Sequence, residues 1–166
     1  MTATSRSLKI RTLAAIGLAS ASLLAAAQSP PPYGLSINIE QAKQAMVAAE
    51  AEARKNSWQV VISIVDTGGH LVMLQRLEAQ TASVDISIGK ARTAVNFRRP
   101  TKALEDSMAT GGSTLRILAV RDALPLQGGL PIIVDGKIIG GIGVSGVLAP
   151  QDEMVAKAGA DLLAAK

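Results

Sequence analysis

The chain has 166 residues, which is enough for one domain with a single hydrophobic core. Hydrophobic residues make up 48% of the sequence and aromatic residues only 2%, so aliphatic side chains must fill that core. Three of the 17 basic residues lie in the first eleven positions and the other 14 nearly balance 13 acidic ones, so charge indicates no nucleic-acid partner, and the absence of cysteine excludes disulfides and thiolate chemistry.

The first 27 residues have the order of a secretory signal peptide. Basic residues come first, an apolar run follows at 13–24, and three alanines end it. The run is too short and too rich in Ala and Ser for a membrane-spanning helix. We expect cleavage after Ala27, a periplasmic or secreted mature protein, and no membrane contact after cleavage. Proline-rich residues 28–34 predict a stiff tether, and residues 35–166 predict one domain.

The domain should begin with a helix that starts at a capping box of Asn38 and Gln41. Basic residues suit its last turn, and Asn56 can end it. The residues on its expected buried stripe are small or flexible: Ala42, Ala45, Met46, Ala49 and Ala53.

The stretch from Trp58 to Leu77 predicts an antiparallel hairpin. Two runs rich in Val, Ile and Leu flank the turn sequence Asp66-Thr67-Gly68-Gly69, and the two glycines suit a turn that needs positive φ. The only histidine of the chain, His70, follows this turn. By period-two alternation we expect His70, Val72 and Leu74 to share one face of the second strand.

A second helix should follow, capped by Thr81 or Ser83 and ended by Pro100. Its expected buried face is Val84, Ile88, Ala91 and Val95, because these residues recur at helical spacing. We then expect Thr101 to cap a short helix that ends at Gly111-Gly112. Residues 113–127 fit either a strand or a short helix.

Residues 131–140 predict a second hairpin around Asp135-Gly136, a pair favoured in two-residue loops. Its outgoing strand should continue through Val144. Pro150 should open a last helix with acidic residues in the first turn. The residues expected on its buried stripe are Met154 or Val155, Ala158 and Leu162.

Residues 141–146 match the dinucleotide fingerprint G-x-G-x-x-G, but the context does not. A hairpin strand precedes the motif and one helix follows it, so no parallel strand can complete a βαβ unit. We expect these glycines to allow close backbone approach instead. A triad of Ser63, His70 and Asp66 lacks any nucleophile elbow, so ordinary hydrolase chemistry is unsupported.

His70 is the chain's best donor to a metal or a porphyrin iron. Residue type alone gives equal weight to a hairpin histidine that is merely hydrogen-bonded. One histidine without cysteine makes a zinc site built by the protein improbable. A cofactor that brings four equatorial nitrogens needs only one such ligand.

Five ordered motifs span residues 35–165: VDTGGHLV at 65–72, KARTA at 90–94, FRRPT at 97–101, GGLPI at 128–132, and IGGIGVSG at 139–146 with QDE at 151–153. Together they resemble the GlcG/HbpS-like family, which includes secreted haem-binding proteins and the C-terminal domain of PduO-type corrinoid enzymes. The resemblance implies an α/β (α+β) class: a profilin-like three-layer α/β/α domain, with helices on both faces of a central antiparallel sheet. It also implies assembly into homo-oligomers, tetramers or octamers.

The resemblance further implies a tetrapyrrole ligand, haem or alternatively a corrinoid, with haem degradation proposed for some members. On that basis His70 is the candidate metal ligand, and Lys90, Arg99 and Thr101 are candidate cofactor-binding residues. Lys90 and Arg99 could meet the carboxylates of the ligand. Catalytic residues stay unassigned, so the resemblance leaves open whether the protein is an enzyme.

One position departs from the secreted haem-binding members. They carry a second acidic residue three positions after the one that matches Asp85, and here that position is Ile88. Iron storage or sensing through such a pair is therefore not expected. Two other functions stay open: an enzyme or accessory protein acting on a small oxidised acid, as in glycolate operons, and an extracytoplasmic accessory to a two-component sensor.

Overall fold

The computed structural model describes residues 29–164, so the expected signal peptide and its cleavage point at Ala27 lie outside the described residues. Four strands form one antiparallel sheet in the order β2-β1-β4-β3. The elements are α1 (Ile39–Lys55), β1 (Val61–Asp66), β2 (Leu71–Arg76), α2 (Ser83–Phe97), α3 (Thr101–Ala109), the 3₁₀ helix η1 (Gly112–Ala119), β3 (Gly129–Val134), β4 (Lys137–Ser145) and α4 (Ala149–Ala164).

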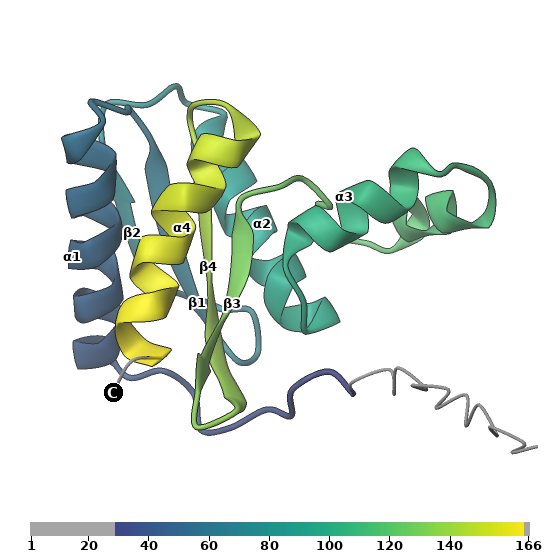
Figure 1. Cartoon of the computed structure of the whole chain (residues 1–166), viewed down its shortest axis with the longest axis horizontal. Coiled ribbons are helices and arrows are strands. Elements are labelled where there is room, and N and C mark those ends of the chain that lie inside the picture. Colours follow the sequence, from purple (N-terminus) through teal and green to yellow (C-terminus); the bar gives the residue numbers. More distant parts are fainter. Residues whose placement is uncertain (1–28, 165–166) are drawn as a thin grey trace, which may run out of the picture.

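The helices lie on both faces of the sheet, which confirms the expected three-layer arrangement. Helices α1 and α4 pack side by side on one face, and α2 crosses the other face over β1, β4 and β3 (Figure 1). The main core lies between the sheet and the α1–α4 layer and is aliphatic, as the composition requires. Its largest fully buried side chains include Ile62, Ile64, Ile132, Ile142, Val60, Val144 and Val155.

Local sequence signals at the start of the domain are confirmed. Asn38 Oδ1 accepts the Gln41 N–H at 2.9 Å, and Gln41 Oε1 accepts the Asn38 N–H at 3.1 Å, which completes the capping box. The helix ends at Asn56, and its buried stripe is the expected one. The hairpin of β1 and β2 is also present, but of its two turn glycines only Gly69 has a positive φ, of +79°.

The face that helix α2 presents to the sheet is only partly the expected one: Ala91 and Val95 are buried as predicted. Val84 and Ile88 are only half-buried, whereas Ser83, Ser87 and Lys90 are buried. The reason lies in β4, where Gly143 leaves no room for a side chain: a Cβ there would meet the Ser87 carbonyl oxygen at 2.1 Å. The helix therefore approaches the strand closely through small residues, as we expected of these glycines.

Two expected helix caps are wrong. Helix α2 begins after Ala82 with no side-chain cap, so neither Thr81 nor Ser83 caps it. Helix α3 has Pro100 at its N-cap position, and Thr101 is its first residue. The Thr101 side chain is fully buried and bonds to β3 instead, because α3 starts against that strand.

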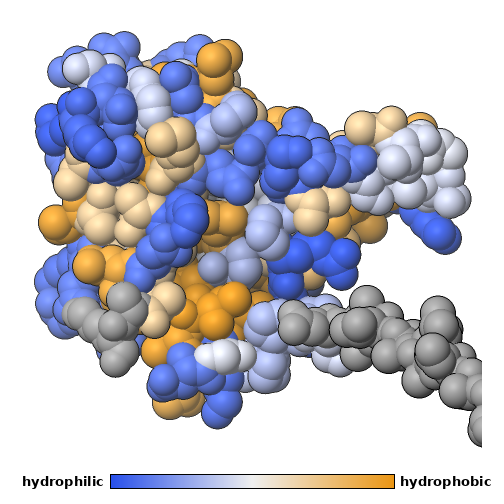
Figure 2. All heavy atoms as spheres, viewed as in Figure 1, coloured by the Kyte–Doolittle hydropathy of each residue, from blue (hydrophilic) through white to orange (hydrophobic). Residues whose placement is uncertain are grey.

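Residues 101–128, which we call the arm, extend away from the body of the domain (Figures 1 and 2). The ambiguous stretch forms η1 within this arm, and none of the residues of η1 is buried. The large apolar side chains that the arm exposes are Leu115 (45%), Leu118 (63%), Val120 (48%) and Leu126 (40%).

The second hairpin is confirmed. Asp135 and Gly136 both have positive φ, 51° and 71°, as a two-residue turn of type I′ requires. The stripe expected on α4 is partly wrong, since Val155 is buried but Leu162 is 40% exposed and its neighbour Leu163 is buried.

The end of the expected tether contacts the sheet. Tyr33 forms a bridge with Ile138, and the Gly34 N–H donates to the Ile138 carbonyl at 2.8 Å. The Tyr33 hydroxyl donates to the Val95 carbonyl at 2.8 Å. Within residues 29–164, no helix is long and apolar enough to span a membrane.

Candidate functional site

His70 lies at the tip of the β1–β2 hairpin with its side chain 82% exposed. The turn is organised by Asp66, whose Oδ1 accepts the N–H groups of Gly68 at 2.8 Å and His70 at 2.9 Å. The same oxygen lies 3.3 Å from His70 Nδ1. This contact favours the tautomer with the proton on Nδ1, so the second ring nitrogen, Nε2, carries a free lone pair.

Asp66 is held in its ionised form. Partial burial acts to raise its pKa, but the hydrogen bonds from the backbone N–H groups of His70 and Gly68, together with the attraction of the His70 ring, lower the pKa below its ordinary value. A carboxylate beside Nδ1 fixes the orientation of the imidazole ring. The turn therefore presents one oriented histidine to solvent, a geometry suited to an axial metal ligand.

Arg92 of α2 supports this turn from behind. Its Nε donates to the Gly69 carbonyl at 3.1 Å. Sequence reasoning missed this residue, although it lies inside the KARTA motif, because nothing in the sequence indicates that residues 69 and 92 meet. A cation thus contacts Gly69, the residue before His70.

The side chains of β2 do not alternate between the two faces of the sheet as expected. A β-bulge between Ile64 and Val65 shifts the pairing of β1 with β2. Val72 packs against the core on the α1–α4 side, whereas Leu74 pairs with Ser63, whose hydroxyl group bonds to Ser87 of α2 on the other face. The expectation that His70, Val72 and Leu74 line one face is therefore wrong, because a bulge breaks period-two alternation.

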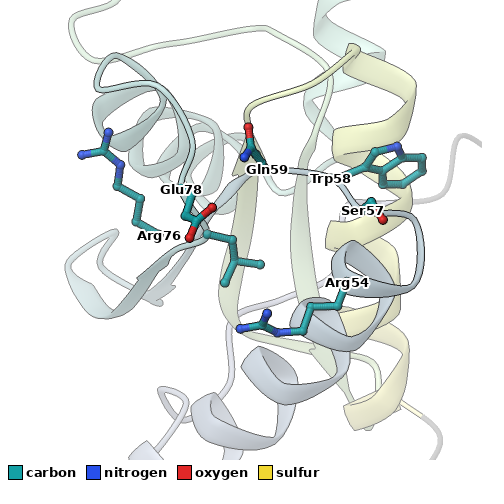
Figure 3. A pocket seen from close by; sticks show the side chains of 7 residues that line it. Arg54, Ser57, Trp58, Gln59, Arg76 and Glu78 are labelled. Atoms are coloured by element: carbon teal, nitrogen blue, oxygen red, sulfur yellow. The ribbon is translucent and has the colours of Figure 1, made fainter.

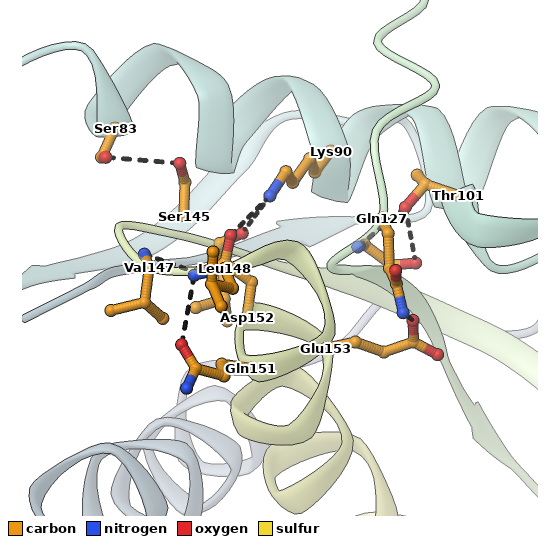
Figure 4. Close-up of polar contacts among 12 residues, drawn as sticks. Ser83, Lys90, Thr101, Gln127, Ser145, Val147, Leu148, Gln151, Asp152 and Glu153 are labelled. Carbon is orange, nitrogen blue, oxygen red and sulfur yellow. Dashed lines mark hydrogen bonds and ion pairs between the residues drawn. The ribbon is translucent and has the colours of Figure 1, made fainter. Parts of the chain in front are cut away.

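Lys90 lies elsewhere, under the arm and beside α4. Its Nζ donates to Asp152 Oδ2 at 2.8 Å and to the Val144 carbonyl at 2.9 Å, and the side chains of the ion pair are 4% and 3% exposed (Figure 4). Burial raises the pKa of Asp152, against the lowering effect of the hydrogen bond and charge of Lys90. The lysine ammonium therefore has two buried acceptors of its own within the fold.

Thr101 lies close to Lys90 on the other side of Gly129. Its hydroxyl accepts the Gly129 N–H at 2.9 Å and donates to the Gly129 carbonyl at 3.3 Å (Figure 4). A Cβ on Gly129 would meet the Lys90 carbonyl oxygen at 2.4 Å and the Thr101 methyl at 2.8 Å. Lys90 and Thr101 thus frame the base of the arm.

Arg99 is exposed beyond the C-terminal end of α2, where its Nε donates to the Phe97 carbonyl at 3.2 Å. With Arg98 it lines a hollow of about 410 Å³ beside Pro30 and Pro31. This end of α2 is also the end that meets the His70 turn.

One chain therefore does not bring all four predicted residues together. Asp66, next to the His70 turn, pairs with Gly140, whereas Lys90 bonds to Val144, four residues further along β4. At roughly 3.4 Å per residue, the two places lie about 14 Å apart along the sheet. His70 lies toward one end of the sheet, and Lys90 with Thr101 lies toward the other.

Two further places lie outside these two groups of residues. Asp85 is exposed in the first turn of α2 and Ile88 is half-buried, and residues 29–164 contain no group of three or more His, Asp or Glu residues that could hold a metal ion. A hollow of about 430 Å³ lies where β1 begins and β2 ends, between Arg54, Trp58 and Glu78 (Figure 3). It is at the end of the sheet opposite His70.

Comparison with known proteins identifies relatives of this chain. A family model described as "Haem degrading protein HbpS-like" matches residues 37–161. Protein GlcG of Escherichia coli K12 is 45% identical over 108 residues, which cover 64% of this chain and 79% of GlcG.

Two solved structures share the fold. HbpS superposes with a TM-score of 0.71 at 32% identity, covering 78% of this chain and 92% of HbpS. A PduOC:heme complex also superposes with a TM-score of 0.71, at 28% identity, covering 77% of this chain and 95% of PduOC.

Proposed function

Because this chain belongs to the HbpS-like family, we propose that it binds a tetrapyrrole, and specifically haem, with His70 as the axial ligand of the iron. The observation that carries the proposal is the geometry of the turn: His70 is 82% exposed, and Asp66 lies on Nδ1, away from Nε2. Neutral imidazole held in this way by a carboxylate is a common arrangement of metal-binding histidines.

The donor set of the chain fits haem better than a bare metal ion. Within residues 29–164 no cluster of three or more acidic or histidine side chains could hold an ion alone. Haem would bring four nitrogen ligands of its own, so a single protein ligand such as His70 would be enough to hold its iron. The work of the protein is then to orient His70 through Asp66 and to hold the hairpin turn in place.

The relatives support the choice of ligand. PduOC, at 28% identity, has been solved as a heme complex, and the matching family is described as haem degrading. For this chain we propose binding, with a corrinoid as the competing ligand. A small acid as substrate has no comparable observation at His70.

Titration of the purified protein with haemin and with cobalamin tests the proposal. We expect a shifted Soret band and saturation at a fixed stoichiometry with haemin, and weaker or no binding of cobalamin. The bound Soret band should stay constant with time, since binding without turnover leaves the ring intact. If cobalamin bound more tightly than haemin, the proposed ligand would be a corrinoid and not haem. Binding of neither would contradict the proposal.

We also propose that the protein is exported and works outside the inner membrane. The support is the basic, apolar and small-residue order of residues 1–27. Mass spectrometry of the periplasmic fraction should find Gln28 as the first residue. An intact Met1 in the mature protein would contradict export by this route.

Assembly into a homo-oligomer is the last part of the proposal. The support is the arm, whose eight-residue 3₁₀ helix has no buried residue and exposes Leu115 and Leu118. Runs of 3₁₀ helix this long are uncommon and gain little from their own hydrogen bonds. A second copy of the chain that covers these apolar side chains would stabilise the arm.

A further inference from the structure

The hairpin turn that carries His70 packs against Arg92 and is hydrogen-bonded to it. The Arg92 Nε–H donates to the Gly69 carbonyl at 3.1 Å. Gly69 has a φ of +79°, and a Cβ at this position would meet Arg92 Cγ at 3.0 Å. The guanidinium group is thus fixed at the residue immediately before His70.

In the described part of the chain, only the Nε edge of this guanidinium group forms a hydrogen bond. Within residues 29–164, Arg92 makes no side-chain hydrogen bond or ion pair besides the one to Gly69, so its two terminal nitrogens have no protein acceptor there. The nearest carboxylate along the turn, Asp66, accepts from Gly68 and His70 instead. A half-buried positive charge without a carboxylate partner favours an anionic group from outside the chain.

Lys90 contrasts with Arg92 on the same helix. The Lys90 ammonium is enclosed with Asp152 and is 4% exposed, so its charge is already compensated. Arg92 keeps a planar fork of donors, which suits bidentate binding of a carboxylate in a way that a lysine does not.

We infer that Arg92 binds a carboxylate of the ligand held by His70, and that it thereby selects tetrapyrroles with free acidic side chains. This inference rests on the proposed function. Arg92 has two tasks: its Nε edge holds the turn, and its terminal nitrogens meet the ligand. One side chain then contacts both the turn and the ligand.

The experiment compares two ligands on each variant: haemin, and haemin dimethyl ester, in which both carboxylates are blocked. Both ligands are titrated in the same detergent-containing buffer. Arg92→Gln should lower the affinity for haemin tenfold or more relative to the affinity for the ester. Arg121→Gln removes the same charge from a 94% exposed side chain on the arm and should leave the ratio of the two affinities unchanged. Arg92→Lys should give an intermediate ratio, because one ammonium cannot serve both acceptors.

Binding of the ester also reports whether the His70 site of each variant is intact. If Arg92→Gln lowered the affinities for haemin and for its ester equally, the inference would be overturned, because Arg92 would then only stabilise the turn. Unchanged affinities for both ligands would overturn it as well. These results differ from a failure of the proposed function, in which the wild-type chain binds neither ligand and the inference falls with it.

Discussion

Lys90 and Asp152 form an ion pair of 2.8 Å across 62 residues of sequence, with side chains only 4% and 3% exposed. The pair joins α2 to the first turn of α4 over the end of β4. Asp152 Oδ1 also accepts the Val147 N–H at 3.2 Å, and the Lys90 ammonium donates to the Val144 carbonyl. Every buried polar atom of the pair therefore has a partner, which is the condition under which buried charges are tolerated.

Removal of one charge should be costly. Asp152→Asn keeps the shape of the side chain but leaves the Lys90 ammonium buried without a carboxylate, so we expect a loss of about 3–5 kcal/mol in the free energy of unfolding. Urea-induced unfolding followed by circular dichroism measures this loss. The double variant Lys90→Met/Asp152→Leu should recover most of it, because both charges are then absent. A loss below about 1 kcal/mol for Asp152→Asn would contradict the structural role of the pair.

Asp66 makes the conformation of the His70 turn depend on pH. Since the pKa of Asp66 is lowered in the folded chain, its contribution to stability is present above the unfolded value of about 3.9 and is lost as pH falls through the lower folded value. The amides of Gly68 and His70 should therefore lose protection from hydrogen exchange as the solution is acidified below about pH 4. Asp66→Asn should weaken that protection at neutral pH as well. Equal protection in the variant would show that the turn does not depend on this carboxylate.

The arm should decide the oligomeric state. We expect light scattering to give a mass well above that of the 17.1 kDa chain. Leu118→Glu should shift the protein toward the monomer, because a charge on a 63% exposed side chain of η1 would be buried at an interface through the arm. Val47→Glu is a matched control, since Val47 is 66% exposed on α1 of the body. A monomeric wild type, or dissociation by Val47→Glu alone, would contradict assembly through the arm.

The sequence predicts those parts of the fold that depend on near neighbours. Asn38 and Gln41 are three residues apart, and Asp135 and Gly136 are adjacent, so their cap and turn follow from local chemistry. The buried face of α2 was predicted only in part: Ala91 and Val95 are buried as expected, but Val84 and Ile88 are half-buried and Ser87 faces the sheet instead. Only the glycines of β4, more than fifty residues away, show that small side chains must face the sheet.

In the candidate site too, local features could be predicted from the sequence and long-range contacts could not. That His70 follows a tight turn is readable from the sequence, and so is the nearby Asp66. The contact of Arg92 with Gly69 and the enclosure of Lys90 by Asp152 depend on how α2 packs on the sheet. Residues on one helix can therefore have opposite environments, which spacing alone does not reveal.

The haemin titration of His70→Ala tests the central claim most directly. The side chain is 82% exposed, so its removal should leave the fold and the circular dichroism spectrum unchanged. We predict that the Soret band of the complex shifts or disappears and that haemin affinity falls tenfold or more, equivalent to about 1.4 kcal/mol. A Soret band and an affinity that match those of the wild type would contradict His70 as the axial ligand.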